Sequence, residues 1–217
     1  MRFRGNSGPA GAVLLRASLL AGLCGGFGPG AAASQVGDAI ALYKQGRYSD
    51  AKAALEPLAA SDPSDPAACY FLAMALQRVA PPSLDSARKW LAKAVRLAPK
   101  NETYLAEYAG VCWLIADRDR SFGLALEGRD SMAKAIAMNP ADLEACEGLM
   151  RFNATAPWPL GDPDKALALA SEIAKRDPKR GSEAFRTIAR LFEGEGRARQ
   201  ALLASQAAQR LARPGAK

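Results

Sequence analysis

The residues of this chain that could perform acid–base or nucleophilic chemistry are few. The sequence of 217 residues contains no histidine, which removes the commonest general base, the histidine-dependent triads and most zinc sites. Ser-x-x-Lys occurs at Ser49, Ser86 and Ser131, but the companion motifs of penicillin-binding enzymes are absent. We expect each copy to open the second helix of a helical pair, with its lysine on the exposed side.

Two groups of carboxylates could share a proton or bind an ion. Glu144 and Glu147 are three residues apart, so on a helix they would lie close enough to share a proton. A carboxylate-based hydrolase would use this pair, and that function remains an alternative. Asp117-x-Asp119-x-Ser121 begins like a calcium loop, yet the required glycine and glutamate are each displaced by one position. We therefore predict no catalytic residue, no metal site and no cofactor.

A recurring phrase predicts the elements that carry these residues. Each copy begins with a small residue. A second residue, apolar in the first four copies, follows four positions later, and a proline ends the phrase. The copies are Ala51-x3-Leu55-x7-Pro63, Ala87-x3-Leu91-x7-Pro99, Gly128-x3-Met132-x7-Pro140, Ala166-x3-Ala170-x7-Pro178 and, one residue out of register, Ala201-x3-Ser205-x8-Pro214. After each of the first four prolines, mostly apolar residues at spacings of three and four predict another helix. They are Cys69, Leu72, Ala73 and Leu76; Leu105, Tyr108, Ala109 and Cys112; Cys146, Leu149, Met150 and Asn153; and Phe185, Ile188, Ala189 and Phe192.

These phrases resemble the tetratricopeptide repeat (TPR), a pair of helices of about 34 residues with an Ala-x3-Phe step and a closing proline. The stretch from Leu42 to Ala51, with Gly46 ending the first helix in a left-handed conformation, resembles the helix–turn–helix of that family. The resemblance, to an exported bacterial member, implies an all-α, right-handed superhelical solenoid of about five helix pairs. Its approximate repeats are 34–65, 66–101, 102–142, 143–180 and 181–214, followed by a disordered tail at 215–217.

Repeats two to four are longer than the family pattern, and the extra residues fall between their two helices. Pro81-Pro82 lies in the first insertion, and the segment from Ala156 to Asp162 forms the last. The longest excess, around Asp117 to Gly128, contains no proline. We expect it to add about one turn to each helix of the third pair.

The first 33 residues predict a secretory signal. They contain Arg2, Arg4 and Arg16, no acidic residue, an apolar run and then three alanines, which is the order typical of an export signal. Cleavage is expected before Ser34, with retention as an anchor as the alternative. The expected location is therefore periplasmic or secreted.

The cysteines beyond that signal are Cys69, Cys112 and Cys146. All three fall on inward positions of first helices, where a free cysteine behaves as a small apolar residue. We expect them to be buried thiols rather than disulfide partners.

The TPR resemblance implies a concave groove that binds an extended peptide or a partner helix. Counting along the first helices, the groove residues should be Tyr43, Tyr70, Phe71, Met74, Gln77, Trp113, Glu144, Glu147, Arg151, Arg186 and Arg190. For Tyr70, Phe71 and Trp113, packing between repeats is the alternative. The lysine and asparagine pairs that clamp a terminal carboxylate in some family members are missing. Trp158, in the proline-rich insertion, is expected either to cover the solenoid edge or to contact a partner.

These features predict a non-catalytic scaffold for protein–protein interaction or assembly in the cell envelope, with a protein or peptide partner. Nucleic acid is not expected as a partner because the chain is exported. The alternative is a structural subunit that contacts a membrane or cell wall through its basic C-terminal end, which contains Arg186, Arg190, Arg197, Arg199, Arg210 and Arg213. The oligomeric state is not predicted.

Overall fold

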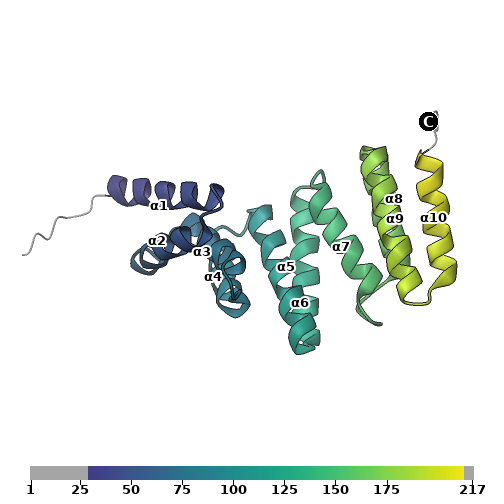
Figure 1. Ribbon diagram of the computed structural model, residues 1–217, viewed down its shortest axis with the longest axis horizontal. Helices are drawn as coiled ribbons and strands as arrows, with labels where there is room; N and C mark the ends of the chain where they lie inside the picture. Colours follow the sequence, from purple (N-terminus) through teal and green to yellow (C-terminus); the bar gives the residue numbers. More distant parts are fainter. Residues whose placement is uncertain (1–28, 213–217) are drawn as a thin grey trace, which may run out of the picture.

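Ten α-helices and no strand make up residues 29–212, the part of the chain that this computed structural model describes. The helices are α1 (Pro29–Lys44), α2 (Tyr48–Ser61), α3 (Pro66–Arg78), α4 (Leu84–Leu97), α5 (Glu102–Asp119), α6 (Phe122–Met138), α7 (Leu143–Thr155), α8 (Pro163–Arg176), α9 (Pro178–Gly194) and α10 (Ala198–Ala212). They follow one another along an elongated array with α1 and α10 at opposite ends (Figure 1).

The helices form five consecutive pairs, and each pair lies beside the next. Within a pair, the second helix packs against the first, and it also packs against the first helix of the following pair. This arrangement confirms the all-α solenoid of five helix pairs expected from the recurring phrase.

Small side chains at the start of the phrase let the helices of a pair approach closely. Ala51, Ala87, Ala166 and Ala201 are buried, and Gly128 occupies the same position in the third pair. The resulting core is divided along the array. One large cluster extends from α1 to α5 and another from α7 to α10, while two small clusters fill the junction of α5, α6 and α7.

Local signals in the sequence set where the helices begin and end. Gly46 has a φ of 77°, so the predicted left-handed end of the first helix is confirmed, and Gly196 repeats it in the last pair with a φ of 70°. In the third pair Arg120 takes this conformation, with a φ of 55°. Six helices start at side chains that accept a backbone hydrogen bond, each worth about 1 kcal/mol: Asp65, Asn101, Ser121, Asp142, Asp162 and Asp177.

The predicted lengthening of the third pair is confirmed. α5 and α6 have 18 and 17 residues, compared with 13 and 14 in α3 and α4. One expectation was wrong as a result, because Ser131 lies in the middle of α6 rather than at its start. The extra turn moves the beginning of α6 back to Phe122.

The first helix begins earlier than the expected mature chain. α1 starts at Pro29 and therefore includes residues 29–33 of the predicted signal. Residues 1–28 and the predicted tail at 215–217 lie outside the described residues, and cleavage before Ser34 stays a prediction. None of the helices within residues 29–212 is long and apolar enough to span a membrane.

All three cysteines in the described part of the chain are buried free thiols, as expected. Burial raises the pKa of Cys69, Cys112 and Cys146. Each lies on the first helix of a different pair, where it packs as a small apolar side chain.

The tightest approach between helices predicts a sensitive glycine. A Cβ on Gly181 of α9 would lie 2.3 Å from the Cα of Ala174 in α8, because only Asp177 separates the two helices. Gly181→Ala should therefore lower the free energy of unfolding by about 1–3 kcal/mol. Gly123→Ala is the matched control, since a Cβ there meets nothing within 4 Å; it should change stability by less than about 1 kcal/mol. Urea unfolding followed by circular dichroism would measure both, and equal effects would contradict the close contact.

Candidate functional site: the groove face

Aromatic rings from three first helices form a continuous chain of contacts. Tyr43 on α1 meets Phe71 on α3 edge to face at 5.5 Å between ring centroids, and Phe71 meets Tyr70 at 5.0 Å. Tyr70 then stacks on Tyr104 of α5 at 4.5 Å. All four rings are only partly buried. The structure thus brings together three predicted groove residues and adds Tyr104.

A stripe of four partly or fully exposed residues continues this surface along α5. Thr103, Glu107, Gly110 and Leu114 follow helical spacing, and the residues on the opposite side of α5 are buried. A Cβ added to Gly110 would meet nothing within 4 Å, and Leu114 is 54% exposed. Gly110 and Leu114 therefore form an uncovered, apolar part of this surface.

The first helices of the neighbouring repeats carry further residues of this surface. We call it the groove face and define it by the following residues: Tyr43 on α1; Tyr70, Phe71 and Gln77 on α3; Thr103, Tyr104, Glu107, Gly110 and Leu114 on α5; and Glu144, Glu147 and Arg151 on α7. α7 approaches α9 more closely than α3 approaches α5. The stacked Tyr70 and Tyr104 bridge the wider separation of α3 and α5.

Glu107 is the charged residue at the centre of the groove face. Burial raises the pKa of its carboxyl group, Arg78 opposes that increase, and Glu144 adds to it. The carboxylate is half-buried, and within residues 29–212 it has neither an ion pair nor a hydrogen bond. Its charge also contributes to the raised pKa of Tyr70, after burial as the main cause.

Met74 and Gln77 lie on α3 beside these rings. Met74 was expected to face the groove, but the structure buries it in the core, where the side-chain amide of Gln77 lies 3.4 Å from its sulfur. Burial also raises the pKa of Tyr43 and of Tyr104. The tyrosines therefore remain neutral hydrogen-bonding groups at physiological pH.

The two carboxylates of α7 have different environments. Arg180 Nε on α9 donates to Glu147 Oε1 at 3.0 Å, and a second guanidinium nitrogen forms an ion pair with the same oxygen at 2.9 Å. Glu144 is exposed. Glu147 therefore acts as a link between two first helices, and the arrangement offers no sign of a proton shared between the two carboxyl groups.

The structure places Trp113 in the packing between repeats rather than with the groove aromatics. Its ring stacks on Phe152 of α7 at 4.8 Å, and its indole Nε1 donates to the Ala125 carbonyl of α6 at 3.3 Å. Room for the indole comes from Gly128, where a Cβ would lie 2.7 Å from Nε1, and from Gly148. Of the two interpretations given for Trp113, packing fits its contacts.

The remaining predicted groove residues are exposed basic side chains farther along the array. Arg151 lies on α7, and Arg186 and Arg190 lie on α9. The Arg190 guanidinium donates to the Arg186 carbonyl at 3.4 Å. The groove face is therefore aromatic on α1, α3 and the beginning of α5 and acidic at Glu107, and exposed basic side chains on α9 lie beyond its end.

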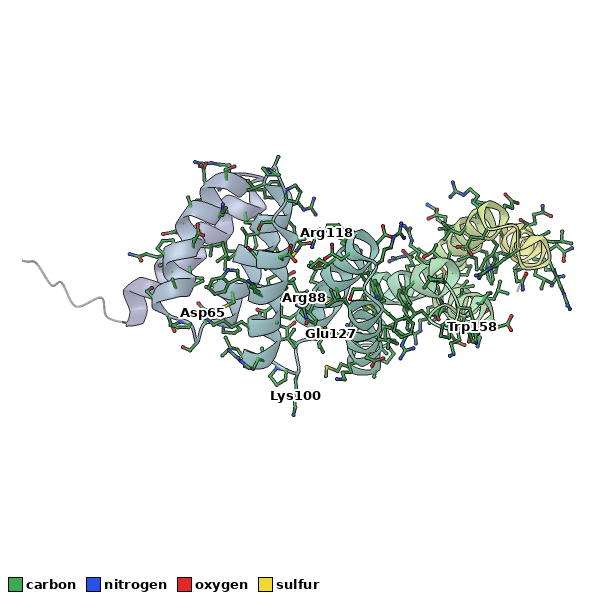
Figure 2. All side chains as sticks on the ribbon, turned by 90° about the horizontal axis from the view of Figure 1, so that it is seen from below. Asp65, Arg88, Lys100, Arg118, Glu127 and Trp158 are labelled. Atoms are coloured by element: carbon green, nitrogen blue, oxygen red, sulfur yellow. The ribbon has the colours of Figure 1, made fainter. Side chains whose placement is uncertain are left out.

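Trp158 projects from the proline-rich loop between α7 and α8, toward the C-terminal part of the array (Figure 2). Its side chain is 88% exposed and borders a cavity of about 500 Å³ that also contacts Arg129 and Asn153. A second cavity, of about 410 Å³, lies between the α5–α6 turn and the end of α7, with Phe122 and Phe152 among its lining residues. Neither cavity includes a residue of the aromatic chain on the groove face.

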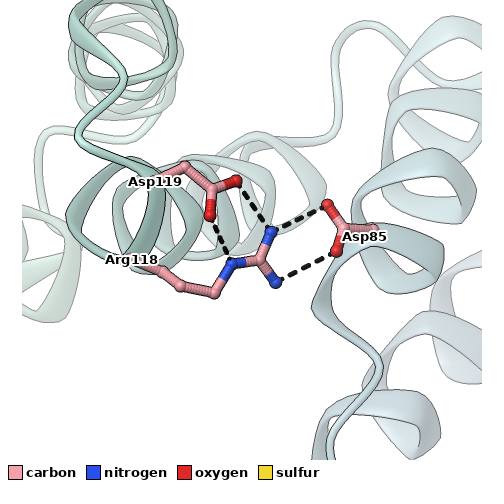
Figure 3. Close-up of polar contacts among 3 residues, drawn as sticks. All are labelled: Asp85, Arg118 and Asp119. Atoms are coloured by element: carbon pink, nitrogen blue, oxygen red, sulfur yellow. Dashed lines mark hydrogen bonds and ion pairs between the residues drawn. The ribbon is translucent and has the colours of Figure 1, made fainter.

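Polar contacts hold the second and third pairs together next to the groove. Arg118 on α5 donates to both carboxylate oxygens of Asp85 on α4, at 3.0 and 3.1 Å, and also to its neighbour Asp119 (Figure 3). Arg88 on α4 donates to Glu127 on α6 at 3.1 Å, and Tyr108 donates to the same carboxylate. Figure 2 shows Arg88, Glu127 and Arg118 at this junction. The contacts help to fix α5 and α6 relative to α4.

Sequence reasoning missed Tyr104, Glu107, Gly110 and Leu114. The repeat register could have identified Glu107, because it lies as many residues after Pro99 as Phe71 lies after Pro63. Tyr104 gave no such signal, since the corresponding residue of α3 is the buried Ala68. Within residues 29–212, no three cysteine or carboxylate side chains gather in a way that could hold a metal ion.

Comparison with known proteins identifies the architecture. No protein-family model and no curated protein matches the chain. Among solved structures, the crystal structure of the MamA protein is similar with a TM-score of 0.66, at 17% identity over 83% of this chain and 91% of that one. YrrB, a TPR protein with an unusual peptide-binding site, has a TM-score of 0.64 at 18% identity, over 83% of this chain and 86% of that one.

TTC0263, a thermophilic TPR protein in Thermus thermophilus, is also similar, with a TM-score of 0.57 and 21% identity over 83% of this chain and 91% of that one. The chain has the tetratricopeptide-repeat fold. In this TPR array the residues of the groove face lie on the first helices of successive repeats.

The two tryptophans predict very different effects on stability. Trp113→Ala should lower the free energy of unfolding by about 3 kcal/mol, because it removes a ring stacked between two helices. Trp158→Ala should change it by less than about 0.5 kcal/mol, because that side chain is exposed. Thermal and urea unfolding of the two variants would test this, and a small effect of Trp113→Ala would contradict its placement in the packing.

Proposed function

We propose that this TPR protein is a non-catalytic scaffold that binds an extended peptide, or a helix of a partner protein, across its groove face. The observation that carries the proposal is the line of partly exposed aromatic rings that leads from Tyr43 to Tyr104, next to the open position at Gly110. Aromatic side chains supply large contact areas in protein interfaces and lose little conformational freedom on binding.

The shape of the surface favours an elongated partner over a small molecule. Its aromatic and apolar residues come from α1, α3 and α5 and form a continuous strip, whereas the two cavities described above lie away from that strip. Backbone groups of a bound peptide could hydrogen-bond to Gln77 on α3, which is partly exposed, and to Thr103 on α5, which is exposed.

A binding role also accounts for the charged residues better than catalysis does. Glu147 is held by Arg180, so the carboxylate pair that a hydrolase would need is divided between a structural link and an exposed side chain. The basic residues Arg151, Arg186 and Arg190 extend the groove face toward the C-terminal repeat, where they could contact acidic residues of the same partner.

We further propose that binding takes place in the cell envelope, in the periplasm or outside the cell. The support for this location is the order of basic, apolar and small residues that precedes Ser34. Protease protection of the full chain in intact cells, compared with lysed cells, would test it; digestion of the chain only after lysis of the inner membrane would contradict export.

A glycine substitution can block the groove face without changing the core. Gly110→Leu adds a side chain where a Cβ meets nothing, so the fold should persist while the open position is filled. Gly123→Leu on α6 adds the same side chain at another open and exposed helical site. Recovery of peptides from a random phage-displayed library on immobilised full chain should fall at least about tenfold for Gly110→Leu and stay unchanged for Gly123→Leu.

Melting curves should first show that both variants fold. Equal recovery by the two variants would contradict binding at the groove face. Failure of the wild-type chain to enrich any peptide would contradict the proposed function itself.

A further inference from the structure

The Glu107 carboxylate is half-buried, yet none of the residues from 29 to 212 pairs with it. Glu147, the other partly buried carboxylate of the groove face, is held by two nitrogens of Arg180. Glu107 has no such contact within residues 29–212, and burial is the main reason that its pKa is raised. A partly desolvated carboxylate gains most from a cation that donates hydrogen bonds to it.

The charged groups around Glu107 leave a net negative site. Arg78 and Glu144 are the two that act on it, with opposite effects. The Arg78 guanidinium lies over the Tyr48 ring, 5.9 Å from the ring centroid, and forms no ion pair with the described residues. The two carboxylates, Glu107 and Glu144, carry one more negative charge than the single guanidinium of Arg78 can balance. That guanidinium lies over the Tyr48 ring.

Aromatic side chains line the approach to this carboxylate. Tyr104 lies three residues before Glu107 on α5 and stacks on Tyr70, which connects through Phe71 to Tyr43. Cations bind favourably at the faces of such rings, and a neighbouring carboxylate adds to that attraction. Gly110, one helical turn after Glu107, leaves space for a long side chain to reach it.

We propose that Glu107 and the rings of Tyr43, Tyr70 and Tyr104 form a subsite for an arginine or lysine side chain of the bound peptide. This inference rests on the proposed function, because it names the partner residue that the groove face selects. The alkyl part of the basic side chain packs on the tyrosine rings while its charged end donates to the Glu107 carboxylate. Acidic residues are disfavoured at that position of the peptide.

The experiment is the selection of a random decapeptide phage library on immobilised full chain, with sequencing of the recovered pool. The wild-type chain should enrich peptides that carry arginine or lysine at one aligned position. Glu107→Gln, which keeps the size of the side chain, should reduce that enrichment about tenfold, the effect of losing one charge-assisted contact. It should still recover peptides with the apolar part of the motif.

Glu56→Gln is the matched control, since Glu56 is an exposed glutamate on the second helix α2 and forms no ion pair within the described residues. It should leave the enrichment unchanged. Glu107→Lys, checked by its melting curve, should shift the preference toward aspartate and glutamate, which a merely destabilised groove would not do.

The outcomes separate the two levels of the proposal. Loss of peptide recovery in Gly110→Leu supports the groove function. If the wild-type chain then shows no preference for basic residues, or if Glu107→Gln keeps that preference, the subsite is wrong and the groove function stands. If the wild-type chain recovers no peptides, the proposed function fails and the subsite fails with it.

Discussion

The close approach of the two helices in each pair is the constraint on which the rest of the structure depends. It requires a small residue at one position of every second helix, and that position holds Ala51, Ala87, Gly128, Ala166 and Ala201. A larger side chain there would push the first helix outward and change which of its residues remain exposed. The groove face is therefore a consequence of packing on the opposite side of the same helices.

The third pair shows how this constraint can be kept while the surface changes. Its helices are longer, and Gly128 at the small position accommodates the Trp113 indole as well as the helix crossing. Trp113 thereby joins α5 and α6 to Phe152 of α7, at the junction between the two large core clusters. On the other side of α5, the stacked tyrosines bridge to α3. These two contacts place Glu107 and Gly110 in the middle of an open surface.

The sequence alone predicted most of the fold, because its signals are local or periodic. The phrase that begins at Ala51 recurs in each pair, Gly46 marks a turn by its left-handed conformation, and the insertion without proline lengthens α5 and α6 as expected. Counting from the phrase failed at Ser131. The extra turn makes α6 begin earlier, so Ser131 lies in the middle of the helix rather than at its beginning.

The candidate site was less predictable, because it depends on contacts between repeats. The repeat register gives Trp113 the same position as Gln77, yet Gly128 and Gly148 make a slot for the indole that no periodic pattern reveals. The sequence gives no partner for Glu147, because Arg180 of α9 lies 33 residues away and reaches it only in the folded chain. Glu107 stands out only in three dimensions, where it is half-buried near the tyrosines and has no ion pair with the part of the chain that the structure describes.

The most direct test of this account is a crystal structure of the full chain bound to a peptide that it selects. The account predicts density for an extended peptide or helix along the exposed sides of α3, α5 and α7, over Gly110 and against the rings of Tyr70 and Tyr104. Density in the cavity beside Trp158, or on the second helices α8 and α10, would contradict the assignment of the groove face as the binding surface.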